Sequence, residues 1–277
     1  MTTEATTAAD GRRKPKPAFR TVLCGVDRSR ADAETTRQAA LLAGPGRLDL
    51  VCVWYGVGTG LAGQATLTED HARVALENAR GIASEICPDV HTAAVLATDP
   101  VEALLEEGTG HDLVVVGSHD HHRSGGIMLG SVATNLAHRL AVPLLVTRLA
   151  EESFPRHILL ASDGSGSAHT AARLAARVAR QHGATVTLVH AGDRDDARHR
   201  KGLAEDSAEL FEQLGVEPVT VYERGDPAEA IVRIAAAEDA SMVVLGSRGL
   251  TGVKAFGSVS ERVVHEAPCS VLVARHP

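Results

Sequence analysis

Two Gly-Ser pairs, Gly130-Ser131 and Gly257-Ser258, stand at matching points of the sequence, and each precedes apolar residues with helical spacing. The first turn of a helix has backbone N–H groups without partners and a partial positive charge, so it attracts anions. Glycine allows an anion to approach the backbone closely, and the serine hydroxyl adds a donor. These residue types predict phosphate binding at two helix starts.

A carboxylate accompanies each pair. Asp27 and Asp163 follow apolar runs that have the character of strands. A carboxylate repels phosphate but accepts hydrogen bonds from sugar hydroxyls. Because a nucleotide has both groups, we interpret the two sets as nucleotide sites. The structural alternative is that each Gly-Ser pair is an ordinary N-cap and each aspartate an ordinary turn residue.

These residues recur because the chain contains two copies of one alternating pattern. In the first copy, strands are predicted at 21–27, 48–55, 91–97, 112–118 and 143–148, with helices at 29–43, at 68–86, after Asp99-Pro100 and after Gly130-Ser131. The second copy repeats this order in HILLASD, AHTAARLAARVARQHG, TVTLVHAGD, 203–214, EPVTVYERGDPAEAIVRIAAAE, SMVVLGSRG and the closing 257–275. The alternation predicts an α/β fold in which each copy is a doubly wound, five-stranded parallel sheet with helices on both faces.

The elements place the polar residues in one region of each copy. In an open parallel sheet the ligand crevice lies beyond the carboxyl ends of the strands, where the winding direction reverses. Gly117 and Gly246 end the fourth strand of each copy, and a glycine there lets the backbone approach a ligand. We therefore expect Asp27, Gly117 and Gly130 to share one crevice.

Duplication is favoured over a single large α/β domain. Four motifs superimpose between the halves: Asp27 on Asp163, Asp99-Pro100 on Asp226-Pro227, Gly117-Ser118 on Gly246-Ser247, and Gly130-Ser131 on Gly257-Ser258. We predict a disordered tail at 1–17, a first domain at 18–149, a linker at 150–153 and a second domain at 154–277.

Composition limits the classes of partner. The net charge is −7 and the basic residues are spread out, so we expect no nucleic-acid partner. No apolar stretch has the length of a membrane span or of a secretion signal, so we expect a cytoplasmic protein with no membrane partner. The cysteines are scattered, which favours buried reduced thiols over a disulfide framework or a zinc site: Cys24, Cys52, Cys87 and Cys269.

Two further motifs are interpreted as loops. Gly58 to Gly63 fits GxGxxG, but no helix follows at once, so a loop is favoured over a dinucleotide fold. The run from His119 to His122 invites a metal, but adjacent loop residues rarely surround an ion without other ligands, so a solvated or phosphate-facing loop is favoured. The chain has no GxxxxGK[ST] or GxSxG pattern, and we assign no catalytic residue.

Both halves resemble universal stress protein domains, and the whole chain resembles a tandem member of that family. The resemblance implies the adenine nucleotide alpha hydrolase-like fold. It also implies that PLLVTR and CSVLVAR pair antiparallel to make an intramolecular pseudo-dimer. In the nucleotide-binding branch, the pattern GxxG, nine residues, then G[ST] wraps the phosphates of ATP, and an aspartate ending the first strand faces the nucleoside.

Each half departs from this pattern at one point. The first keeps the nine-residue spacer 121–129 but has Asp120 in place of the second glycine. The second keeps Gly246, Gly249, Gly257 and Ser258 but has seven residues, 250–256, as its spacer. Three cations in these loops are candidates for pairing with phosphate: Arg123, Arg248 and Lys254. The alternative is that they are solvated loop side chains. By the resemblance, the residue whose backbone would hold the adenine is Tyr55 in the first half and Ala191 in the second. We expect the large Tyr55 side chain to crowd the pocket.

We therefore expect a stress-response protein that binds an adenine nucleotide weakly or in only one repeat. The resemblance favours ATP; ADP and cyclic AMP stay open, as do Mg²⁺ bound with the nucleotide and a homodimer of the tandem chain. The first alternative function is a scaffold that binds partners without nucleotide. The second is a slow nucleotidase, which ranks last because no general base is identifiable.

Overall fold

The computed structural model describes residues 17–29, 31–55, 68–118, 129–149, 154–192, 211–213, 215–247 and 256–275. Several predictions fall outside these residues. They are the tail up to residue 16, the GTGLAG and SHDHHRS motifs from Gly58 and His119 onward, the 150–153 linker, and most of the 203–214 helix.

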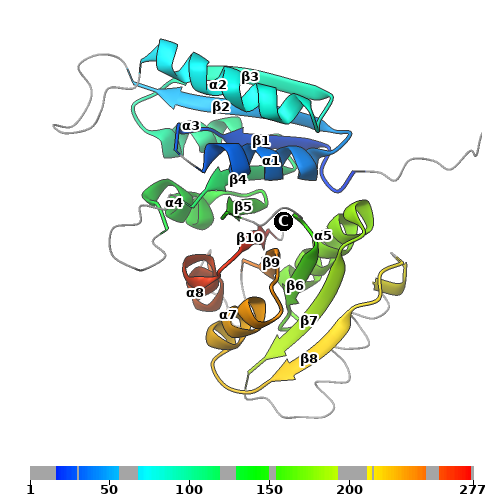
Figure 1. The fold of residues 1–277 in the computed structure, drawn as a ribbon. Coiled ribbons are helices and arrows are strands. Elements are labelled where there is room, and N and C mark those ends of the chain that lie inside the picture. The colour runs from blue at the N-terminus through cyan, green and yellow to red at the C-terminus, as the bar shows by residue number, and fades with distance from the viewer. Residues whose placement is uncertain are drawn as a thin grey trace, which may run out of the picture.

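Within the described residues, ten strands form one sheet that runs through the molecule (Figure 1). The first half contributes β1 (Thr21–Gly25), β2 (Arg47–Trp54), β3 (Asp89–Leu96), β4 (Leu113–Gly117) and β5 (Leu144–Thr147). The second contributes β6 (His157–Ala161), β7 (Thr185–Ala191), β8 (Val219–Glu223), β9 (Met242–Gly246) and β10 (Ser270–Ala274). The strand order is β3-β2-β1-β4-β5-β10-β9-β6-β7-β8, so each half is a doubly wound parallel sheet, as predicted.

The two halves meet at β5 and β10. These strands pair antiparallel, with Leu144, Leu145 and Val146 opposite Val273, Leu272 and Val271. All six residues are fully buried. The predicted antiparallel pairing is confirmed, and the chain is an internal pseudo-dimer.

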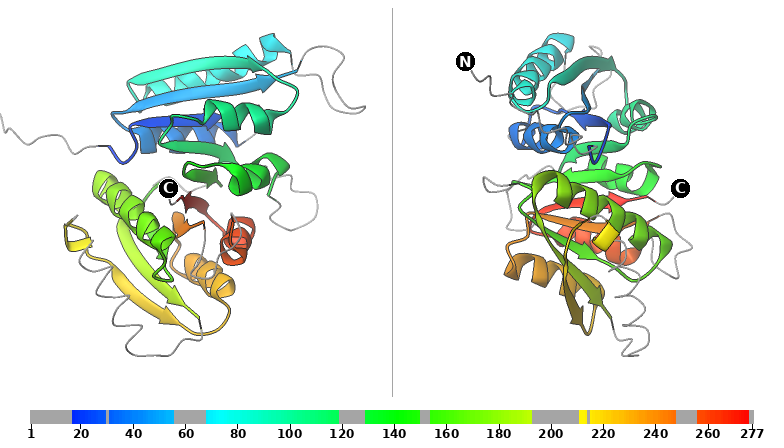
Figure 2. Two further views of the ribbon diagram at one scale, coloured as in Figure 1. Left: turned by 180° about the vertical axis from the view of Figure 1, so that it is seen from behind. Right: turned by 90° about the vertical axis from the view of Figure 1, so that its right-hand side faces the viewer.

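Helices cover both faces of the sheet. One core is formed with α1 (Asp32–Ala43), α2 (Glu69–Ser84) and α5 (Gly166–His182), and the other with α3 (Pro100–Glu107), α4 (Ser131–Arg139), α7 (Pro227–Ala237) and α8 (Ser258–Glu266). Alternate residues of β1 serve the two cores, since Cys24 packs in the first and Leu23 in the second. The right-hand view of Figure 2 shows α1 and α2 on one side of the first half and α3 on the other.

Local signals explain most helix ends. Ser165 accepts a hydrogen bond from the Ala168 N–H at the start of α5, and Gly183 ends the helix with a left-handed backbone (φ 68°). Asp99 and Asp226 cap α3 and α7 in the same way, each followed by proline at the first helical position. The starts of α3 and α7 after the Asp-Pro pairs match the sequence predictions, whereas α5 begins two residues before the predicted Ala168.

The predicted start of α1 was wrong. The helix was predicted from Ser29 but begins at Asp32, because the residues before it form a turn in which the Arg28 backbone is left-handed (φ 68°) and the Ser29 hydroxyl accepts the Ala31 N–H. The Asp32 carboxylate accepts the N–H groups of Asp27 and Arg28 and thereby holds this turn in place. The turn moves the helix start away from the end of β1.

The four cysteines are free and buried, as predicted. None of the helices in the described residues has both the length and the apolar character needed to span a membrane.

Candidate functional site

A cavity of about 680 Å³ lies at the carboxyl ends of β1, β2 and β4, bordered by α3 and α4. This is the crevice position where the winding of the first repeat reverses. Its lining includes residues that we expected to meet there: Asp27, Gly117, Gly130 and Ser131. The structure therefore brings together the described part of the predicted first site.

The start of α4 forms one wall of the cavity. Its first three residues, Ser131 to Ala133, all line the space, and Gly130 precedes them with an extended backbone (φ −65°, ψ 153°). Among the described residues, no side chain caps these first-turn N–H groups. An uncapped helix start beside a cavity suits an anion.

Both loops that lead to the Gly-Ser pairs close with the same bond. The Gly130 N–H donates to the Ser118 carbonyl at 3.0 Å, and the Gly257 N–H donates to the Ser247 carbonyl at 2.8 Å. Although the second loop is two residues shorter than the first, both helix starts are therefore held by the same backbone hydrogen bond. Arg123, Arg248, Gly249, Asp120 and Lys254 lie within these loops, outside the described residues.

An acidic pair lies just after β1, and one of its two members lines the cavity. Asp27 lines the cavity, and its carboxylate accepts the Ser29 N–H at 2.9 Å. Half-buried Asp32 accepts the Asp27 N–H at 3.1 Å. Burial, together with the negative charge of Asp27, raises the pKa of Asp32 from 3.8 to about 7. Asp163 forms the same turn in the second repeat, accepting the Ser165 N–H at 3.0 Å.

Apolar residues line the middle of the cavity. Val26, Val51, Val53 and Tyr55 contribute to it, which suits a flat, apolar ring. Burial raises the pKa of Tyr55, with smaller effects of Cys52 and Asp99, so the phenol is neutral. Tyr55, which we expected to crowd the pocket, is one of the residues that line the cavity.

The second repeat has bonds of its own across the matching region. The Ser260 hydroxyl donates to the Gly246 carbonyl at 2.7 Å, whereas the matching Ala133 lines the first cavity. Arg262 forms an ion pair with Asp226 at 2.8 Å. In the first repeat the position of Arg262 is taken by Asn135, which cannot form an ion pair with Asp99.

The two strand-ending glycines meet different neighbours. A Cβ added to Gly246 would lie 2.6 Å from the Ser167 hydroxyl oxygen and 2.8 Å from the Ser167 backbone. A Cβ added to Gly117 would meet only the Thr35 hydroxyl, at 3.3 Å. At position 246 glycine is thus required by the close approach of α5, independent of any ligand.

Sequence reasoning missed several lining residues. Asp99 was recognised as a repeated motif, but only the structure puts it in the cavity wall. Asn135 and Arg139 also line the cavity, and they follow Ser131 at successive intervals of four residues on one helix, which was a usable signal. Asp32, which accepts the Asp27 N–H, is not itself a lining residue and carried no such signal, because its counterpart in the second repeat is Ala168.

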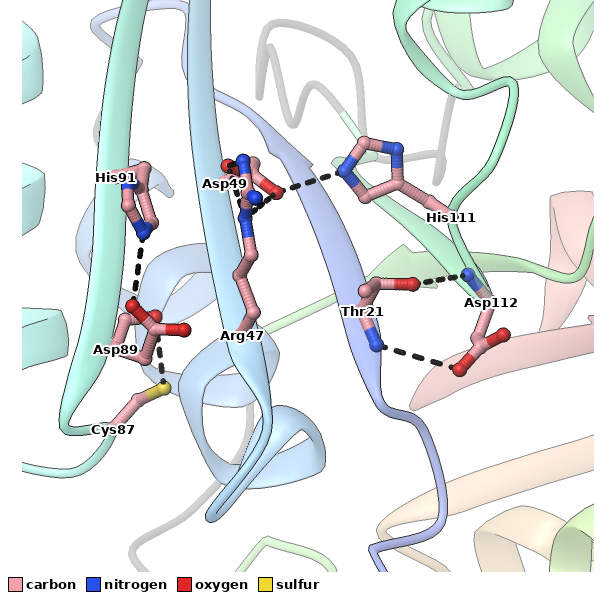
Figure 3. A network of polar contacts seen from close by, with 8 residues as sticks. All are labelled: Thr21, Arg47, Asp49, Cys87, Asp89, His91, His111 and Asp112. Carbon is pink, nitrogen blue, oxygen red and sulfur yellow. Dashed lines mark hydrogen bonds and ion pairs between the residues drawn. The ribbon is translucent and has the colours of Figure 1, made fainter.

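A second polar network lies at the amino-terminal ends of the strands of the first repeat, opposite the end that carries the cavity (Figure 3). Asp49 accepts from Arg47 and contacts His111 Nε2 at 2.9 Å. Burial acts to raise the pKa of Asp49, but the hydrogen bonds from Arg47 and His111 outweigh it and lower the pKa. We interpret this network as structural. The described residues contain no group of three or more His, Cys, Asp or Glu side chains placed to hold a metal ion.

Comparisons with known proteins agree with this architecture. The model of the universal stress protein family matches residues 18–148 and 155–275. A universal stress protein of Mycolicibacterium smegmatis is 28% identical over 285 residues, covering 92% of this chain and 96% of that protein. One from Thermus aquaticus is 39% identical over 133 residues, covering 43% of this chain and 97% of its own length.

A solved structure shows the same fold over most of the chain. The crystal structure of a universal stress protein from Archaeoglobus fulgidus superimposes with a TM-score of 0.70 and 21% sequence identity. The superposition covers 93% of this chain and 99% of that one. The arrangement of two repeats in one chain therefore occurs in a structure already solved.

Proposed function

The chain belongs to the universal stress protein family, and from this premise we propose that it is a stress-response protein whose first repeat binds an adenine nucleotide. ATP is the nucleotide we propose, with ADP and cyclic AMP as alternatives. The nucleotide acts as a regulatory ligand, and the scaffold without nucleotide is the competing hypothesis.

The cavity of the first repeat is the observation that carries this proposal. At about 680 Å³ it is within the usual size range of small-molecule sites, and it combines three different walls. Val26, Val51 and Val53 offer an apolar surface to the base, Asp27 an acceptor to the ribose, and the start of α4 donors to phosphate. A nucleotide requires these three properties in one space.

The second repeat is the weaker candidate. Asp163, Gly257 and Ser258 repeat the pattern, but Ser260 and Arg262 already bond to Gly246 and Asp226. A ligand there must replace or bypass these bonds, which lowers its net binding free energy. This supports binding in one repeat.

Titration calorimetry of the full chain with ATP, with and without Mg²⁺, tests the proposal. Gly130→Asp is the informative variant, because position 130 has an extended backbone that aspartate tolerates and aspartate is a good N-cap. Its carboxylate takes the first-turn N–H groups and repels phosphate. Loss of two charge-assisted hydrogen bonds lowers ATP affinity by about 100-fold.

Gly257→Asp is the matched control, since it makes the same change at the start of α8. We expect it to leave the ATP affinity of the chain within about twofold. Equal losses in both variants would place the nucleotide in both repeats, and saturable binding unaffected by Gly130→Asp would place the phosphates elsewhere. Absence of binding by the wild-type chain would favour the scaffold, and steady phosphate release would favour the nucleotidase.

A further inference from the structure

Two buried arginines occupy equivalent positions just after the closing strands. Arg148 follows β5 and is 5% exposed, and Arg275 follows β10 and is 8% exposed. Burying a guanidinium is costly unless its N–H groups find acceptors, so their partners indicate why they are there.

The partners lie in the opposite repeat. Arg148 Nη2 donates to the carbonyl of Val264 at 2.7 Å, in the last turn of α8. Arg275 Nη2 donates to the carbonyl of Ala137, in the last turn of α4. Ala137 and Val264 are themselves equivalent, so the two contacts cross the β5–β10 seam as a symmetric pair.

The contact matters to α4 because the last carbonyls of a helix have no partner within it. The Leu136 carbonyl is satisfied by the Leu140 N–H at 2.9 Å, but Ala137 depends on a donor from outside the helix. Arg275 supplies that donor and places a positive charge at the negative end of the helix dipole. With nine residues, α4 is about 13 Å long, so fixing its end also fixes the start that lines the cavity.

Arg275 is itself held by a packed cluster between α4 and α8, which lie side by side near the seam (Figure 1). Its guanidinium carbon lies 5.7 Å from the centre of the Phe256 ring. The His138 ring packs edge-on against the same phenyl ring at 5.2 Å, and His138 Nε2 lies 3.5 Å from the Glu261 carboxylate. The end of α4 is therefore built from residues of both repeats.

We propose that Arg275 is a positioning residue for the crevice of the first repeat, supplied by the second repeat, and that Arg148 has the same role for α8. The cavity of one repeat is thus held in shape by the other, which gives the tandem arrangement a purpose beyond covering two sheet edges. This inference rests on the proposed function for its ligand but not for its mechanical part.

Hydrogen exchange on the ligand-free full chain tests the mechanical part. In Arg275→Ala, backbone amides of α4 should exchange about tenfold faster while those of α8 change less than twofold, and Arg148→Ala should show the reverse. Arg275→Lys should restore part of the protection, because lysine keeps one donor and the charge. Equal effects on both helices in both variants would overturn the proposal, since they would show general weakening of the seam.

Calorimetry with ATP then tests the link to the site. Arg275→Ala should lower ATP affinity about tenfold, and Arg148→Ala less than twofold. If the alanine variants do not fold, the comparison uses Arg275→Lys and Arg148→Lys, with smaller changes in the same direction. Unchanged affinity in the Arg275 variant would overturn the positioning role. Absence of ATP binding by the wild type would instead refute the proposed function, while the exchange pattern still decides the crossed contacts.

Discussion

In the turn after β1, the two repeats differ in the residue that has a left-handed backbone. Arg28 has a left-handed backbone (φ 68°) where the second repeat has Gly164 (φ 78°). A residue with a side chain pays about 1 kcal/mol for this conformation, which glycine adopts freely. The first repeat offsets the cost through Asp32, whose carboxylate accepts the Arg28 N–H. The pair Asp27 and Asp32 therefore belongs to the hydrogen-bonded turn after β1.

Asp32 should make stability depend on pH. Its pKa is about 7 in the folded protein against an ordinary value of 3.8, so the folded protein holds a proton that the unfolded chain releases. The stability contributed by this proton is complete below pH 3.8, falls as pH rises, and is lost above about pH 7.

The variant Asp32→Asn, which cannot ionise, isolates this effect. Raising the pH from about 5 to about 8 should lower the unfolding free energy of the wild type relative to the variant, as measured by urea denaturation. The comparison removes the contribution of the histidines, which both proteins share. A difference that stays constant over this range would show that Asp32 is ionised throughout.

At the scale of elements, the two helix starts that face the crevices are alike in backbone and differ in their surroundings. Gly130 and Gly257 both have extended backbones, and no described side chain caps either helix. The difference lies one turn further on, where α8 has Ser260 and Arg262 in place of Ala133 and Asn135. Small changes on one helix face therefore give the second repeat hydrogen bonds and an ion pair that the first repeat lacks at these positions.

Two glycine substitutions test how far backbone conformation alone sets helix stability. Gly81 lies inside α2 and Gly183 ends α5, and at neither position would a Cβ meet an atom within 4 Å. Gly81→Ala should stabilise the protein by up to about 1 kcal/mol, because alanine favours the helix. Gly183→Ala should destabilise it by about 1 kcal/mol, because the position requires positive φ.

Urea denaturation of both variants measures the two effects. Since each change adds the same methyl group in open space, packing contributes little to either. Effects of the same sign would mean that contacts outside these helices, and not their backbone conformations, control the outcome.

At the scale of the whole molecule, the β5–β10 seam makes the two repeats one body. Buried hydrogen bonds support the pairing. The backbone N–H of Arg148 donates to the Ser270 hydroxyl at 3.0 Å. The Gln38 side chain accepts from the Ser270 hydroxyl at 2.7 Å and donates to the Arg148 carbonyl at 2.9 Å. These groups are buried, so separation would expose an apolar sheet edge and leave polar groups without partners.

The seam should hold without a covalent connection. Residues 1–150 and 151–277, co-expressed as separate chains, should purify as a one-to-one complex by size-exclusion chromatography. Leu272→Asp in the second chain should abolish the complex, because it places a charge in a fully buried position. Two folded halves that elute separately would contradict the prediction.

The sequence alone determined the duplicated α/β fold, because apolar period, turn residues and repeated motifs are local properties of the chain. Through the family resemblance it also led to the antiparallel β5–β10 pairing. It placed Asp27, Gly117 and Gly130 in one crevice, because the carboxyl ends of parallel strands must meet at one edge.

Only the tertiary structure showed the cavity in the crevice of the first repeat and the long-range contacts around the two helix starts. Ser260 and Gly246 are 14 residues apart, and Arg275 reaches Ala137 across 138 residues, so no local pattern relates them. Contacts of this kind depend on side chains meeting across elements. The two repeats share the crossed arginine contacts but differ at Ser260, whose hydroxyl bonds to Gly246 where the first repeat has Ala133. The repeat explains why there are two helix starts, and packing explains why they are not equivalent.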